Sequence, residues 1–243
     1  MYRQESKPTH LTRRTFTMGV GAASALACTS PFAIGRAKDV ALKVAVLLPR
    51  SGVQALLGDD CHRGVKVAHE ILRKLGLPAL EIMTGDTESN ADIARTRAEQ
   101  MINEGARLLV GAFDSSQSTA IAQVAEQRSI PFIINISAAP QITEQGYKFV
   151  FRNFPTAPMI LSDAFANQKE LFAASGAAPK SVVLMRVNDA FGNAMQNGIG
   201  IFFPKFDLPY KITETIAYDP MGRDFSLEVA KAKATGADGL LTV

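Results

Sequence analysis

The chain has 243 residues, of which 47% are hydrophobic and 20% are charged, a balance typical of a soluble globular protein with one or two domains. Its formal net charge is +3, but five of the 26 basic and one of the 23 acidic residues lie at or before Ala37, which leaves 21 and 22 and a net charge of −1. The basic character therefore belongs to the first 37 residues, which argues against a nucleic acid as partner.

Residues 1–37 have the pattern of an export signal. Thr12-Arg13-Arg14-Thr15-Phe16 is similar to the twin-arginine motif, and an apolar segment over 18–27 follows it. That segment is shorter than the about 20 apolar residues that cross a bilayer. We predict a twin-arginine signal peptide over 1–37 and a periplasmic location. A lipoprotein anchored through Cys28 is one alternative, with Ala25 in the place of the usual leucine, and an arginine-containing start of a cytoplasmic protein is another.

After this leader, strands and helices alternate with short connections. Apolar runs predict strands at 40–48, 80–83, 108–111 and 130–134, and stripes at helical spacing predict helices at about 59–75, 91–103 and from Ser115 onward. Asp59 or Asp60 is the expected cap of the first helix, and Asn90 that of the second. This alternation predicts a doubly wound parallel sheet.

The stretch from Leu108 to Pro140 carries the strongest indication of a binding site. Ser115 and Ser116 follow one buried strand, and the small-residue turn 135–140 follows the next. In open parallel sheets, ligands bind beyond the carboxyl ends of the strands. We therefore expect the two turns to form one side of a cleft for a small molecule.

The alternation is interrupted near residue 150 and then resumes. Residues 147–152 predict a strand with an aromatic core face, and helices at 159–174, 191–203 and 225–234 then alternate with strands at 181–185, 211–217 and 239–243. We predict an α/β fold of two doubly wound parallel-sheet lobes, with lobe 1 at 38–152 and lobe 2 at 153–243. Because the chain stops on an apolar strand, we expect the second lobe to be incomplete and the chain to be part of a longer protein.

Catalytic motifs are missing from the sequence. It contains no G-x-S-x-G, H-E-x-x-H or P-loop pattern, and only three histidines. The neighbouring Cys61 and His62 have no second cysteine or histidine cluster to complete a metal site, so we expect a structural thiol near a helix start. The sequence thus predicts a protein that is not an enzyme and has no cofactor.

Five motifs, in this order and spacing, resemble the type I periplasmic solute-binding proteins of ABC importers, the leucine/branched-chain amino acid receptor family. They are Leu48-Pro49-Arg50-Ser51-Gly52, Gly111 with Ser115-Ser116, Phe151-Arg152, Asp189-Ala190-Phe191-Gly192 and Asp224-Phe225-Ser226. In the last motif, we expect Asp224 to cap a helix and Phe225 to be buried. The resemblance implies that two lobes close over a free amino acid or related small carboxylate and dock on a membrane permease. A ligand-sensing receptor of this fold and an exported α/β enzyme are the alternatives.

The candidate ligand-binding residues come from three regions. They are Arg50, Ser115, Ser116, Ile136, Ser137, Ala138 and Phe191. The resemblance implies that Ser115 and the helix N-terminus hold a carboxylate, while Ser116 caps the helix and Phe191 contacts the ligand or packs beneath its own helix. Two positions depart from the family pattern: Ala138 has no hydroxyl, and Leu57 stands where an aromatic residue is usual. These departures argue against an ordinary α-amino acid and leave a keto acid, an aromatic acid or an amide.

Overall fold

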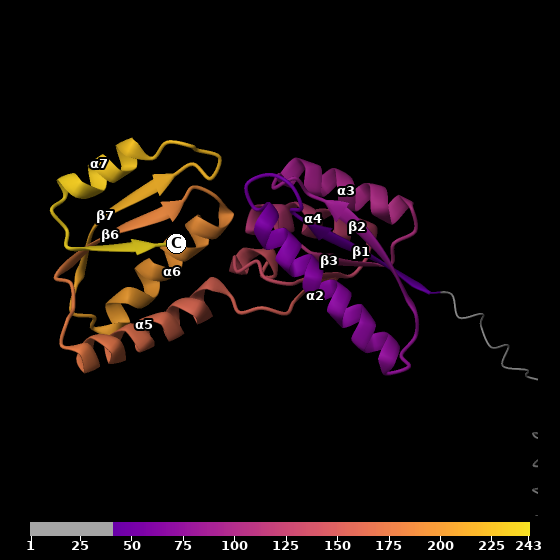
Figure 1. Cartoon of the computed structure of the whole chain (residues 1–243), viewed down its shortest axis with the longest axis horizontal. Helices are drawn as coiled ribbons and strands as arrows, with labels where there is room; N and C mark the ends of the chain where they lie inside the picture. The colour runs from indigo at the N-terminus through magenta and orange to yellow at the C-terminus, as the bar shows by residue number, and fades with distance from the viewer. Residues whose placement is uncertain (1–40) are drawn as a thin grey trace, which may run out of the picture. The chain divides into compact units, whose positions relative to one another are not determined.

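Two parallel β-sheets organise the chain in the computed structural model, which describes residues 41–243 (Figure 1). The first sheet has the order β2 (Leu80–Asp86), β1 (Leu42–Leu48), β3 (Leu108–Gly111), β4 (Phe132–Ile134) and β5 (Val150–Arg152). The second has the order β7 (Lys211–Tyr218), β6 (Ser181–Val187) and β8 (Gly239–Thr242). The predictions made for residues 1–37, including those on Cys28, lie outside the described residues.

Helices connect the strands of both sheets. They are α2 (Ala55–Lys74), α3 (Ala91–Asn103), α4 (Ser115–Arg128), the short 3-10 helix η1 (Pro140–Ile142), α5 (Ala157–Ser175), α6 (Ala190–Phe206) and α7 (Ser226–Ala234). In each sheet the chain starts on an inner strand, pairs it on one side, and then crosses to the other side. This confirms the predicted fold class of parallel, doubly wound sheets. The division into two lobes at Arg152 stays a prediction, since residues 41–243 form one compact unit.

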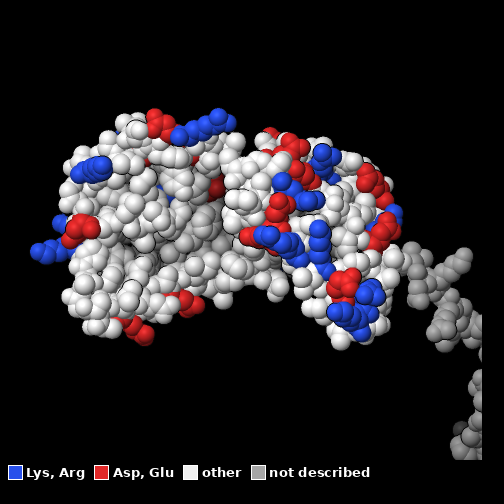
Figure 2. Space-filling model, viewed as in Figure 1, with Lys and Arg blue, Asp and Glu red and all other residues white. Residues whose placement is uncertain are grey.

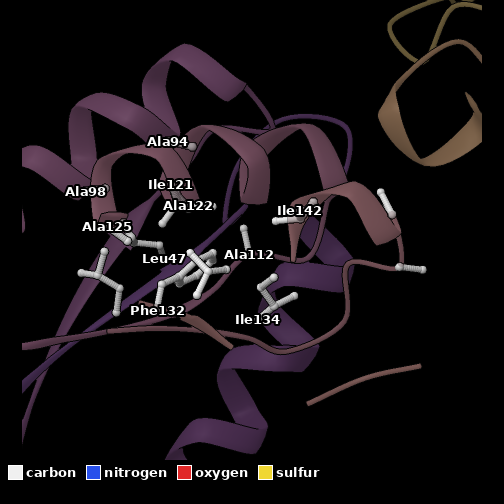
Figure 3. Close-up of a cluster of buried hydrophobic side chains, with 14 of the residues drawn as sticks. Leu47, Ala94, Ala98, Ala112, Ile121, Ala122, Ala125, Phe132, Ile134 and Ile142 are labelled. Carbon is white, nitrogen blue, oxygen red and sulfur yellow. The ribbon is translucent and has the colours of Figure 1, made fainter. Parts of the chain in front are cut away.

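β1 is buried on both faces, which explains its nearly continuous apolar sequence. Val44, Val46 and Leu48 point to one side, where they pack with Cys61 and Val65 of α2. Ala45 and Leu47 point to the other side and belong to a larger core. That core contains alanines of α3 and the apolar stripe of α4, which are labelled in Figure 3 as Ala94, Ala98, Ile121, Ala122 and Ala125. Because small residues face the sheet, the two helices lie close against it.

The helix α2 and the strand β2 extend beyond their predicted bounds. α2 begins at Ala55 rather than near residue 59, so the prediction that Asp59 or Asp60 caps it is wrong. These carboxylates lie inside the helix instead, where Asp59 forms an ion pair with Arg50. β2 continues three residues past Met83 because its backbone pairs with β1 as far as Leu48 opposite Asp86. The cap at Asn90 is confirmed: its side chain accepts from two N–H groups of α3.

The aromatic residues of two segments are more exposed than predicted. Val150 is the buried residue of β5, whereas the side chain of Phe151 is 52% exposed, so the predicted aromatic core face is wrong. β5 is an edge strand, which pairs only with β4 among the described strands. Phe225, predicted to be buried behind an Asp224 cap, is itself the N-cap residue of α7 and is exposed, with its ring against that of Tyr218.

Charged side chains of both signs are interspersed on α2. Asp60 pairs with Arg63 and Glu70 pairs with Arg73, each one helical turn apart. Figure 2 shows blue and red side chains mixed over this region rather than gathered by sign. Such exposed pairs contribute little to stability, typically about 0–1 kcal/mol. Within residues 41–243, no helix is both long enough and apolar enough to span a membrane.

Candidate functional site

A cavity of about 400 Å³ lies at the carboxyl ends of strands from both sheets. The first sheet contributes the turns after β3 and β4, and the second contributes residues after β6, β7 and β8. Its lining residues are Gln54, Phe113, Asp114, Ser115, Ile136, Ser137, Ala138, Phe154, Ile160, Val187, Asp189, Phe191, Tyr218, Pro220 and Val243. This is the place where open parallel sheets bind ligands.

A second cavity, of about 530 Å³, is larger but lies at the opposite end of the second sheet. It is bounded by Val182 at the start of β6, by Gly239 at the start of β8, and by Phe172 and Tyr210. Amino ends of parallel strands offer no helix N-termini and few converging loops. We therefore take the cavity at the carboxyl ends as the candidate site and call it the strand-end pocket.

Asp114 is the N-cap of α4. Its Oδ1 accepts hydrogen bonds from the backbone N–H groups of Ser116, at 2.7 Å, and Gln117, at 3.0 Å. The expectation that Ser116 caps this helix is therefore wrong. An ionised carboxylate is a strong acceptor and is also favoured by the positive end of the helix dipole, so Asp114 fills the role one residue earlier.

Ser115 and Ser137 join the two turns of the first sheet. The Oγ of Ser115 accepts from the N–H of Ala139 at 3.4 Å. The hydroxyl of Ser137 lies 2.8 Å from the carbonyl oxygen of Ala112 and 2.9 Å from that of Asp114. Both serines are buried. The Ser137 hydroxyl thus points to the neighbouring turn, and its hydrogen atom is used within the protein.

Asp114 ends a chain of polar side chains that begins in the protein interior. The Thr87 hydroxyl donates to Oε1 of Gln117, whose Nε2 donates to Oε1 of Gln54 at 2.8 Å. Nε2 of Gln54 in turn donates to Oδ2 of Asp114 at 3.2 Å. Because Thr87 and Gln117 are almost completely buried, this chain holds the second carboxylate oxygen of Asp114 in place.

Asp189 has the same position beside the second sheet as Asp114 has beside the first: it precedes a helix that follows a strand end. It caps α6, and its Oδ1 accepts from the N–H of Gly192 at 2.8 Å. Burial raises the pKa of Asp189, and the negative charge of Asp114 raises it further, while the Gly192 N–H lowers it. Phe191, the next residue but one, lines the pocket and also packs on the core. Two capping carboxylates therefore face the same space.

The structure brings most, but not all, of the predicted site residues to the pocket. Ser115, Ile136, Ser137, Ala138 and Phe191 line it. Two others, Arg50 and Ser116, do not. Arg50 lies outside the pocket, where its Nε is 3.4 Å from Oδ1 of Asp59.

Ser116 does not line the pocket either. Its Oγ accepts a hydrogen bond from the N–H of Ala190, at the start of α6, at 3.4 Å. Other wall residues were not predicted from the sequence, above all Gln54, Asp114 and Tyr218. A signal for Asp114 was present, because aspartate directly before a helix is a typical N-cap.

The sequence profile described as "Periplasmic binding protein" matches residues 41–243. The chain belongs to this family. Among curated members, the Leu/Ile/Val-binding protein homolog 7 of Brucella abortus (strain 2308) is 28% identical over 210 residues, which are 82% of this chain and 51% of that protein. Homolog 8 of the same strain is 30% identical over 149 residues, 60% of this chain and 36% of that protein.

Solved structures of other binding proteins have the same fold. A leucine-binding protein from Thermotoga maritima MSB8 superposes with a TM-score of 0.71 and 26% identity, covering 83% of this chain and 55% of that one. A solute-binding protein of an ABC transporter from R. palustris, solved with benzoate, gives a TM-score of 0.70 at 24% identity, covering 84% and 55%. The chain thus spans about half the length of these relatives. Family members are described as binding proteins rather than enzymes.

Proposed function

We propose that this protein is the extracytoplasmic substrate-binding component of an ABC importer and that it captures a small organic molecule in the strand-end pocket. One observation supports this above all: residues of both parallel sheets contribute walls to one pocket at the carboxyl ends of their strands. A ligand that contacts both walls stabilises the arrangement in which they are close together. Closure over the ligand, followed by docking on a membrane permease, is then the working mechanism.

Within this proposal, Ser115, Ile136, Ala138 and Phe191 contact the ligand. Ser115 is the polar member of this group, and its hydroxyl already lies at the junction of the two turns. Replacing it with alanine removes one hydrogen bond, so we expect binding to weaken by about 0.5–1.5 kcal/mol. Thr96→Ala is the matched control, because the Thr96 hydroxyl bonds within α3, to the carbonyl oxygen of Asp92, and Thr96 does not line the pocket. Equal losses in the two variants would assign Ser115 to folding alone.

A thermal-shift screen tests the function directly. The purified protein is heated with amino acids, keto acids, aromatic acids, amides and amines, each in large excess. A compound that binds only the folded state raises the free energy of unfolding by RT ln(1 + [L]/Kd), about 2.7 kcal/mol at 100 times Kd. No shift with any class would contradict the proposal. Uptake of a labelled hit by cells with and without the protein then tests delivery to a permease.

Export belongs to the same proposal. Arg13 and Arg14 form the twin-arginine pair of the predicted signal peptide. Replacing both by lysine keeps the charge but removes the motif, so we expect the protein to remain in the cytoplasm. Cell fractionation with an antibody measures this. Unchanged export of the double variant would contradict a twin-arginine signal.

A further inference from the structure

The polar walls of the strand-end pocket are acidic. Asp114 enters from the first sheet and Asp189 from the second, and no lysine, arginine or histidine is among the described residues that line the pocket. Asp114 is about 9% exposed, so its charge is poorly screened by water. The two carboxylates are close enough for the charge of Asp114 to raise the pKa of Asp189. The pocket therefore has a preferred sign of charge.

The helix ends reduce this negative charge but do not cancel it. The N-termini of α4 and α6 each carry about half a positive charge, whereas each capping carboxylate carries a full negative one. Two carboxylates against two helix ends leave about −1, a sum that does not include Arg186. Arg186 lowers the pKa of Asp189, but its Nη1 donates to the carbonyl oxygen of Val187 and it is not a wall residue. A carboxylate ligand here would add a further negative charge.

Both carboxylates keep acceptor capacity for a ligand. A carboxylate offers about four acceptor positions. The protein supplies Asp114 with three donors, two on Oδ1 and one from Gln54 on Oδ2. Asp189 receives the Gly192 N–H on Oδ1. At least one position on each residue is thus open to an N–H donor that enters the pocket.

The remaining walls suit the carbon frame of an organic cation. Aromatic rings contribute much of the apolar lining: Phe113, Phe154, Phe191 and Tyr218. Ring faces attract ammonium groups, typically by about 0.5–2 kcal/mol, in addition to burying apolar surface. The same rings would also accept a neutral aromatic acid, so the two carboxylates decide the preference.

We propose that the strand-end pocket selects a ligand with a net positive charge, a protonated amine or a related nitrogen cation. Its charged nitrogen lies between Asp114 and Asp189, and its carbon atoms pack on the aromatic walls. This inference rests on the proposed function of the pocket as the ligand site. It replaces the expectation that the N-terminus of α4 holds a ligand carboxylate, because Asp114 already occupies two of its N–H groups.

Three probes of nearly equal shape test the sign of charge: benzylamine, which is a cation at pH 7, neutral benzamide, and anionic benzoate. Calorimetry with the purified protein measures the affinity of each. We expect benzylamine to bind at least tenfold more tightly than benzoate, with benzamide between them. Tighter binding of benzoate would overturn the proposal while leaving the proposed function intact. If neither these probes nor any compound of the wider screen binds, both proposals fall.

Isosteric variants locate the effect. Asp114→Asn and Asp189→Asn keep a good N-cap residue but remove the charge, so both should fold. Each should weaken benzylamine binding at least tenfold and narrow the gap to benzoate. Asp224→Asn is the matched control, since Asp224 accepts from the Ser226 N–H at the start of α7 but does not line the pocket. Equal affinity for benzylamine in parent, Asp114→Asn and Asp189→Asn would overturn the proposal.

Discussion

The Nη2 of Arg152 lies 2.6 Å from the carbonyl oxygen of Ala139, and its Nη1 donates to the carbonyl oxygen of Ser137. Arg152 is the last residue of β5, next to the turn that follows β4. The planar guanidinium therefore holds two carbonyls of the turn that carries Ser137 and Ala138. A strand outside the pocket thus shapes one of the pocket walls.

Replacing Arg152 tests this support. Arg152→Met keeps much of the apolar stem but leaves two carbonyl groups without their donors, so we expect unfolding to become easier by about 2–4 kcal/mol. Ligand affinity should fall as well, since the turn loses its fixed geometry. Urea denaturation and calorimetry measure the two effects. Arg73→Met removes an exposed ion pair with Glu70 and should change stability by less than about 0.5 kcal/mol. Similar losses in both variants would contradict the assigned role.

The cap of α4 makes a separate prediction. Asp114→Ala leaves the N–H groups of Ser116 and Gln117 without a side-chain acceptor, which should lower the free energy of unfolding by about 1–2 kcal/mol. Asp114→Asn should lower it by much less, because asparagine is an equally good N-cap residue. Thermal unfolding by circular dichroism compares the two. Equal losses would show that the charge, and not the cap, stabilises this helix.

Two glycines of α6 should respond to alanine in opposite directions. A Cβ on Gly192 would lie 1.8 Å from the carbonyl oxygen of Val187, so the start of the helix must move away from β6. We expect Gly192→Ala to destabilise the protein by about 1–3 kcal/mol. A Cβ on Gly200 meets nothing within 4 Å, and alanine there should stabilise the helix by about 0.5–1 kcal/mol. Two changes of the same sign would contradict this packing.

Asp238 predicts a dependence of stability on pH. Its carboxylate accepts from the N–H groups of Lys180 and Ser181, which lowers its pKa from 3.8 to about 2. Since the folded state favours the ionised form, this contribution is present above pH 3.8 and is lost as the pH falls toward 2.

A matched pair of amide variants measures this dependence. Asp238→Asn should therefore be less stable than the parent at pH 6, and the difference should shrink between pH 4 and pH 3. Urea denaturation at these pH values measures it, with a substitution of the exposed Glu170 of α5, Glu170→Gln, as the control. A constant difference at every pH would contradict the assignment.

The fold could be predicted because its inner strands, above all β1, are buried on both faces and therefore appear as apolar runs. The bounds that were wrong depend on contacts distant in sequence. β2 is extended by its pairing with β1, and α2 begins early where Gly58 approaches the carbonyl of Pro49 and Ser89 binds the backbone of Gln54. Neither contact can be derived from local propensity.

The site was predicted in part for a related reason. Ser115, Ile136, Ser137 and Ala138 directly follow strand ends, so sequence position alone places them at the cleft. Gln54 reaches the pocket only through the direction of its side chain and through its partner Gln117, 63 residues away in sequence. Such placement depends on tertiary structure, which periodicity does not encode.

Hydrogen bonds within the protein hold the loop that carries Gln54 in place. The Oγ of Ser89 accepts from the Gln54 N–H at 3.1 Å and donates to the carbonyl oxygen of Ser51 at 2.8 Å. Side chains that are already ordered lose little rotational freedom on binding, a loss that otherwise reaches about 0.5–1.5 kcal/mol for each flexible side chain. Much of the entropic cost of forming this wall of the pocket is therefore met when the protein folds, and a small ligand can bind it with few contacts.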